Sequence, residues 1–170
     1  MKDLYLLRHG IAVQPGTPGI PDDERPLTPK GQKRMQQIAR GLRRLDLRLD
    51  RIITSPLPRA RATAEIVADE LGAGDRLETA DVLRAGAEAS TIRDWLRDRT
   101  EDRLMIVGHN PALTDLITLL VLGATRPQPQ VCELKKGAIA ALKPSTIAPD
   151  RYELLWVATP RLIRRLAGGR

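Results

Sequence analysis

Two histidines, His9 and His109, are the side chains of this sequence best suited to chemistry at neutral pH. An imidazole can attack as a nucleophile or donate a hydrogen bond, depending on which ring nitrogen carries the proton. Each histidine follows a short apolar run typical of a buried strand, and each has a glycine beside it, Gly10 in one case and Gly108 in the other. A histidine at a strand end is as often structural as functional, so its neighbours have to decide between the two interpretations.

The neighbours favour an anion site. Arg8 supplies a permanent cation, and Gly10 lets the backbone turn sharply and approach a ligand closely. Backbone N–H groups of a helix expected after His109 favour a negative charge at the same place. Arg59 lies one turn into a helix expected to begin at Ser55-Pro56, and its side chain can lean back toward the start of that helix. The spacing alone does not distinguish this position from a surface arginine.

The rest of the pattern predicts elements that bring these residues together. Strands are expected at 3–7, 51–54 and 104–107, with further strands around 138–142 and 152–157. Helices are expected where a capping side chain precedes proline, at Thr28-Pro29, Ser55-Pro56 and Asn110-Pro111, and another is expected after Ser90. This alternation predicts an α/β fold with a sheet covered by helices on both faces. Ligands of such sheets bind beyond the carboxyl ends of the strands, where both histidines fall.

The chain of 170 residues has no repeat or long linker, which predicts a single domain over 1–170, with 161–170 as a flexible basic tail. A loop is expected at 124–129. No apolar run reaches the roughly 18 residues of a membrane span, and Arg8 interrupts the first apolar stretch too early for a signal peptide. A cytoplasmic protein without a membrane partner is therefore expected. Cys132 is the single cysteine, which excludes an internal disulfide, and it is expected to be a buried hydrophobe.

Neither a metal nor a cofactor is expected. The two histidines are far apart in sequence with no carboxylate at ligand spacing, and no glycine-rich nucleotide-binding motif occurs. The net charge of +7 fits either a solvated, arginine-rich surface or a positive field that attracts an anionic substrate. Nucleic acid is not an expected partner, because aromatic residues make up only 2% of the chain and bases would find few stacking surfaces.

Four blocks of the sequence, in order, resemble the signatures of the histidine phosphatase (phosphoglycerate-mutase-like) superfamily. These blocks are Leu7-Arg8-His9-Gly10, then Leu27-Thr28 with Gly31, then Ser55-Pro56 with Arg59-Ala60 and Thr63-Ala64, and last Gly108-His109. The stretch from Asp22 to Thr28 also resembles the Asp-x-x-Arg-Pro-Leu-Thr pattern of the SixA-like phosphohistidine phosphatases, matched by Asp22 and Arg25.

This resemblance implies a three-layer α/β/α sandwich with a mostly parallel sheet, and a phosphate pocket lined by Arg8, His9, Arg59 and His109. In that pocket His9 is the nucleophile that becomes phosphorylated, and His109 donates a hydrogen bond to the phosphoryl group. Two guanidinium groups can bind the charged oxygens with paired hydrogen bonds. The charges of Arg8 and Arg59 are expected to keep His9 neutral by repulsion.

A general acid is the part that the sequence does not identify. Glu78, Asp81 and Glu88 lie in the region where many relatives carry one, but none stands in a recognisable motif. An imidazole leaves phosphorus more readily than a sugar hydroxyl does, so phosphohistidine, on a phosphorylated protein, is the expected substrate. Two alternatives stay open: a phosphatase of small phosphate esters with Asp81 or Glu88 as the acid, and a non-catalytic binder of phosphorylated partners.

Overall fold

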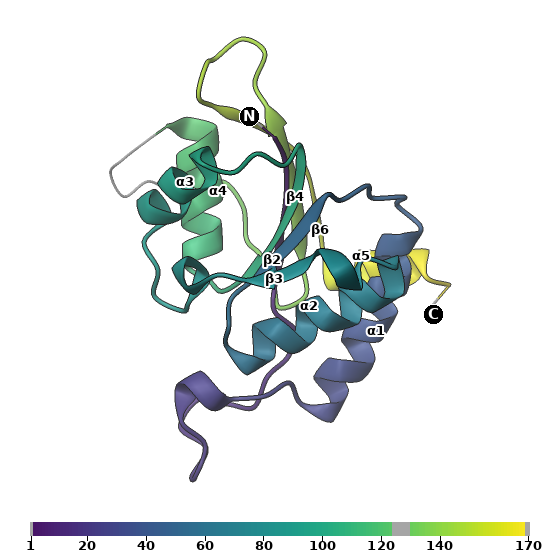
Figure 1. Cartoon of the computed structure of the whole chain (residues 1–170). Coiled ribbons are helices and arrows are strands. Elements are labelled where there is room, and N and C mark those ends of the chain that lie inside the picture. The colour runs from purple at the N-terminus through teal and green to yellow at the C-terminus, as the bar shows by residue number, and fades with distance from the viewer. Residues whose placement is uncertain (1, 124–129, 169–170) are drawn as a thin grey trace.

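A six-stranded sheet with helices on both faces forms the molecule (Figure 1). The structure is a computed structural model and describes residues 2–123 and 130–168. Its strands are β1 (Asp3–Arg8), β2 (Arg51–Thr54), β3 (Leu77–Thr79), β4 (Arg103–Gly108), β5 (Ile139–Pro144) and β6 (Tyr152–Ala158). Its α-helices are α1 (Pro29–Arg43), α2 (Pro58–Leu71), α3 (Ala89–Arg97), α4 (Ala112–Leu122) and α5 (Pro160–Leu166). Three short 3₁₀ turns, η1 (Asp22–Glu24), η2 (Gly74–Arg76) and η3 (Asp81–Leu83), complete the described elements.

The sheet has the strand order β3-β2-β4-β1-β5-β6. The first four strands pair in parallel, whereas β5 runs antiparallel to both β1 and β6. Helices α3 and α4 cover one face, and α1, α2 and α5 cover the other (Figure 1). The predicted three-layer sandwich with a mostly parallel sheet is therefore confirmed, as are the five predicted strands within one or two residues at each end. The three-residue strand β3 was not predicted.

Both faces of the central strands are buried, which is why these strands read as continuous apolar runs. In β1, Leu4 and Leu6 pack in the core under α3 and α4, whereas Leu7 packs in the core under α1 and α2. In β4, Ile106 and Val107 divide between the two cores in the same way. Side chains of successive strand residues point to opposite faces, so each strand contributes to both layers.

The three predicted helix starts have different outcomes. Thr28 caps α1 as predicted, because its hydroxyl accepts a hydrogen bond from the Gly31 N–H at 2.9 Å. Helix α2 begins at Pro58, three residues after Ser55, and α4 begins at Ala112 without a side-chain cap. The predicted caps Ser55 and Asn110 are therefore wrong. The Ser55 hydroxyl lies against His109, and the Asn110 amide donates to the Leu134 carbonyl oxygen.

The predicted flexible tail is also wrong for the residues that form α5. Thr159 caps this helix by accepting a hydrogen bond from the Leu162 N–H, and Ile163 is fully buried. Ile163 lies against Gly41 of α1, where an added Cβ would be 2.1 Å from the Ile163 carbonyl oxygen. Apolar burial therefore anchors a segment whose charge suggested disorder. The predicted loop at 124–129 lies outside the described residues, and no described helix is long and apolar enough to cross a membrane.

Candidate active site

The two histidines lie side by side at the carboxyl ends of neighbouring parallel strands. Strands β1 and β4 pair directly with Arg8 opposite Gly108, so His9 and His109 leave the same edge of the sheet. Their ring centroids are 5.1 Å apart and the ring planes are inclined by 54°. Both are buried, with 6% of His9 and 3% of His109 exposed. A single small ligand at this edge can thus reach both rings.

One tautomer of His9 is selected by its surroundings. Its Nδ1 lies 2.7 Å from the carbonyl oxygen of Gly10, and a carbonyl can only accept a hydrogen bond. Nδ1 therefore carries the proton, and Nε2 keeps a free lone pair. The pKa of His9 is lowered to about 4, first by burial and then by the charges of Arg59, Arg8 and Lys136, against the opposing effect of the Gly10 hydrogen bond. The two arginines do act as predicted, but desolvation is the larger cause.

His109 is held by Ser55. Its Nε2 lies 2.9 Å from Ser55 Oγ. The same oxygen accepts a hydrogen bond from the Leu57 N–H at 3.3 Å, which leaves the hydroxyl proton for another partner. Nδ1 of His109 is buried and has no hydrogen-bond partner among the described residues. Burial, followed by the neighbouring His9 and three arginines, lowers the pKa of His109 to about 3. The Ser55 hydroxyl that the sequence suggested as a helix cap thus orients an imidazole instead.

Arg59 and Arg8 approach the histidines from two elements. Arg59 is the second residue of α2, and only 2% of it is exposed. Its Nη1 donates to the carbonyl oxygen of Asp22 at 2.8 Å, and its Nη2 lies 3.6 Å from the Asp22 carboxylate. Arg8 donates from Nη1 to the carbonyl oxygen of Leu134 at 2.7 Å. The Nε atoms of both arginines are buried without a partner in the described structure. The four predicted site residues therefore converge on one place.

Arg25 and Lys136 belong to the same cluster, although sequence reasoning gave neither a role. Arg25 is 8% exposed and donates to the Asp22 carboxylate at 2.8 Å and to the Val13 carbonyl oxygen at 2.7 Å. Its charge contributes to the lowered pKa of His109. The Arg25 hydrogen bond holds the pKa of Asp22 below its usual value. Burial, and then three arginines of the cluster, lower the pKa of Lys136. The Asp-x-x-Arg spacing was the available signal for Arg25; nothing in the sequence pointed to Lys136.

Gly10 is required by packing rather than by a sharp turn. A Cβ at this position would lie 2.6 Å from Cγ of Met35 on α1. The Gly10 N–H donates to the hydroxyl of Thr63 at 3.0 Å, and that hydroxyl donates to the Arg59 carbonyl oxygen at 2.7 Å. Thr63 thus ties the loop after His9 to the helix that carries Arg59.

The three candidate acids have partners other than the histidines, or none, among the described residues. Asp81 is exposed and pairs with Arg84 at 2.9 Å. Glu78 bonds to Arg99, and Glu88 is an exposed residue at the start of α3. No hydrogen bond or ion pair of the described residues joins any of the three carboxylates to a histidine.

Comparison with known proteins agrees with this architecture. Residues 4–85 match the model of the histidine phosphatase superfamily, branch 1. An uncharacterized protein of Picosynechococcus sp. is 36% identical over 144 residues, which is 83% of this chain and 84% of that protein. The phosphohistidine phosphatase SixA of Escherichia coli is 26% identical over 127 residues, covering 73% of this chain and 77% of the relative. The structure of the protein histidine phosphatase SixA complexed with tungstate superimposes with a TM-score of 0.77 at 23% identity, covering 94% of this chain and 97% of that one. The chain therefore belongs to the histidine phosphatase superfamily, as a phosphatase of the histidine-nucleophile type.

Proposed function

We propose that this protein hydrolyses phosphohistidine and that His9 is the residue that becomes phosphorylated. The observation that carries the proposal is the His9 ring itself: Gly10 fixes its proton on Nδ1, and its low pKa keeps Nε2 unprotonated and nucleophilic at neutral pH. The relative named phosphohistidine phosphatase supports the choice of substrate.

In the first step, the Nε2 lone pair of His9 forms a bond to phosphorus while the phosphorus–nitrogen bond of the substrate breaks. The bonding electrons leave with the substrate imidazole, which takes up a proton. Charge on the three equatorial oxygens is stabilised by the guanidinium groups of Arg8 and Arg59. His109 contributes a hydrogen bond from Nδ1 in the tautomer in which the Ser55 hydroxyl donates to its Nε2.

In the second step, water attacks phosphorus and the bond to His9 Nε2 breaks. Inorganic phosphate leaves, and the ring returns to its neutral form. The same four side chains serve this step, because its charge distribution repeats that of the first. Asp22 holds the Arg59 guanidinium in place, because its backbone carbonyl oxygen accepts a hydrogen bond from Nη1 and its carboxylate lies 3.6 Å from Nη2.

The contacts of the candidate acids, as far as the structure describes them, support phosphohistidine over a phosphate ester. An alkoxide leaving group needs a proton from a nearby acid, whereas an imidazole leaves more readily. Asp81 is directed to Arg84, and Glu88 is exposed at a helix start. A substrate panel separates the two reactions: turnover of phosphohistidine should exceed that of sugar phosphates by orders of magnitude.

The decisive experiment is trapping of the phosphoenzyme. A phosphorylated histidine is labile to acid and survives alkali, and the label should be absent from His9→Ala. Arg59→Ala should lose about 3 kcal/mol of transition-state stabilisation, a hundredfold or more in kcat. Arg61→Ala is the matched control, because Arg61 lies on the same helix but is exposed and paired with Glu65. Normal turnover by His9→Ala would refute the mechanism, and tight binding of phosphate without turnover would favour a non-catalytic binder.

A further inference from the structure

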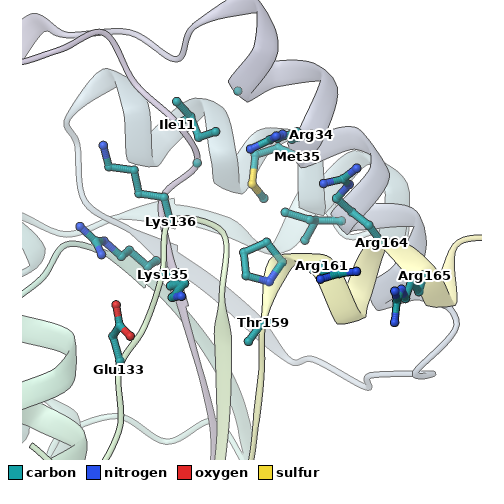
Figure 2. Close-up of a pocket in the computed structure, with 15 residues that line it drawn as sticks. Ile11, Arg34, Met35, Glu133, Lys135, Lys136, Thr159, Arg161, Arg164 and Arg165 are labelled. Atoms are coloured by element: carbon teal, nitrogen blue, oxygen red, sulfur yellow. The ribbon is translucent and has the colours of Figure 1, made fainter. Parts of the chain in front are cut away.

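A cavity of about 770 Å³ opens beside the active site. It shares Arg8 and Gly10 with that site, and it extends between α1, α5 and the segment that precedes β5 (Figure 2). We refer to it as the basic cavity, because seven cations and one carboxylate, Glu133, line it. The seven cations are Arg8, Arg34, Lys135, Lys136, Arg161, Arg164 and Arg165.

The cations of the basic cavity are unpaired, unlike most arginines of this protein. Twelve arginines elsewhere, among them Arg25 and Arg103, lie within 4.0 Å of a carboxylate oxygen. Over residues 2–123 and 130–168, none of the seven cations of the cavity has such a partner. Glu133 forms no ion pair there either. The excess positive charge is therefore concentrated next to the catalytic edge, where it attracts anions.

The lining has an apolar centre and a charged rim. Ile11 and Pro160 line it as half-buried apolar residues, together with the buried Met35 and Ile38 of α1. Arg161 and Arg165 of α5 are exposed. Figure 2 shows Met35 between the arginines on one side and the lysine pair 135–136 on the other. An apolar centre inside a polar rim is the arrangement of protein–protein contacts, whereas a small polyanion would need its cations at the bottom of the pocket.

The cavity wall formed by α5 is firmly held. Arg164 donates from Nε to Oε1 of Gln37 on α1 at 2.8 Å. Ile163 packs without any gap against Gly41, as described above. The cations of α5 are thus carried on a fixed helix, so little ordering is required when a partner binds.

We propose that the basic cavity docks an acidic protein segment, in which carboxylates surround an apolar side chain, next to the phosphorylated histidine of a substrate protein. The proposal rests on the proposed function, because Arg8 joins the cavity to the site where the phosphoryl group is transferred. The apolar side chain contacts Ile11 and Pro160, the half-buried apolar residues of the lining, and the carboxylates pair with the arginines of α5. Attraction of this kind raises the rate of encounter and selects among partners.

The test compares two synthetic phosphohistidine peptides of equal length, one with Asp and Glu around a leucine, the other with Asn and Gln in those positions. The wild-type protein should have a kcat/KM about tenfold higher for the acidic peptide, as expected for a few surface ion pairs. Arg161→Gln/Arg165→Gln should lose most of that preference through KM, with an unchanged kcat and unchanged turnover of the neutral peptide. The matched control is Arg40→Gln/Arg44→Gln, which removes two exposed charges from α1 and its end, outside the cavity.

Several outcomes would overturn the docking proposal. Equal kcat/KM for both peptides, or an equal loss in the control variant, would leave no role for the cavity. Competition by a short single-stranded DNA of the same charge, as strong as that of the acidic peptide, would indicate a nucleic-acid surface instead. Failure of the phosphatase proposal is recognised separately, as absence of turnover of free phosphohistidine. In that case binding of the labelled, unphosphorylated acidic peptide is measured by fluorescence anisotropy. Binding to the wild-type protein that is lost in Arg161→Gln/Arg165→Gln supports docking, and absence of binding to the wild-type protein refutes it.

Discussion

Acidification tests the electrostatics of the site directly, because the chain has only two histidines and both are buried in it. The pKa of His9 is lowered to about 4 from an ordinary value of 6.5. At pH 5.5 an ordinary histidine is about 90% protonated, whereas His9 should be only about 3% protonated. The difference corresponds to about 3 kcal/mol against charging the ring in the folded state.

The same shift makes folding depend on pH. Between pH 4 and 6.5 the unfolded chain binds a proton at His9 that the folded chain does not bind, so the free energy of unfolding rises with pH. This contribution is fully present above pH 6.5 and is lost as the pH falls toward 4. From pH 7 to pH 5, His9 alone should cost about 2 kcal/mol of stability. His109, whose pKa is lowered to about 3, acts in the same direction.

The assay is a two-dimensional proton–carbon NMR titration, in which the two ring signals are followed from pH 8 to pH 4, with urea unfolding at pH 7 and pH 5. His9→Gln assigns the signals and should flatten part of the pH dependence of stability. Arg59→Gln should raise the pKa of His9 by less than half of the total shift, because burial is the larger cause. If either ring titrates near pH 6.5 in the folded protein, the reasoning about a neutral, desolvated nucleophile is wrong.

Two substitutions test the packing and the orientation of the site. Gly31→Ala should destabilise the fold by about 2 kcal/mol or more in urea unfolding, since its Cβ would lie 2.0 Å from the backbone oxygen of Ile11. Gly74→Ala is the control, because its Cβ would meet no atom within 4 Å. Ser55→Ala should lower kcat about tenfold to a hundredfold with little change in KM, because His109 loses the hydroxyl that orients its ring; an unchanged kcat would exclude this positioning role.

The convergence of the histidines could be predicted from the sequence because it depends on strand direction. Once two apolar runs form neighbouring parallel strands, the residues that follow them must meet at one edge. Arg59 is assigned to this edge through the family resemblance, and it lies there even though α2 begins two residues later than expected, because the shift leaves it in the first turn. The alternation of apolar runs and capped helix starts determined the placement of the two histidines.

The contributions of Arg25, Lys136 and Ser55 could not be read in the same way. Arg25 is held by a carbonyl of Val13 and the carboxylate of Asp22, two contacts in an irregular segment with no periodicity. Ser55 before proline is typical of a helix cap, and only the approach of β4 gives its hydroxyl another partner. The prediction of a flexible tail failed for a related reason. Burial of a single side chain, Ile163, is enough to hold the helix in place despite the charged residues around it.

Helix α5 carries its anchoring residue and the residues of the proposed docking surface on different sides. Ile163 is buried against Gly41 of α1, whereas Arg161 and Arg165 are exposed. Exchanging these outward residues therefore leaves the interior and the two imidazoles undisturbed. A lineage of such proteins can acquire new protein partners by small surface replacements on one short helix, while inheriting the phosphoryl chemistry unaltered.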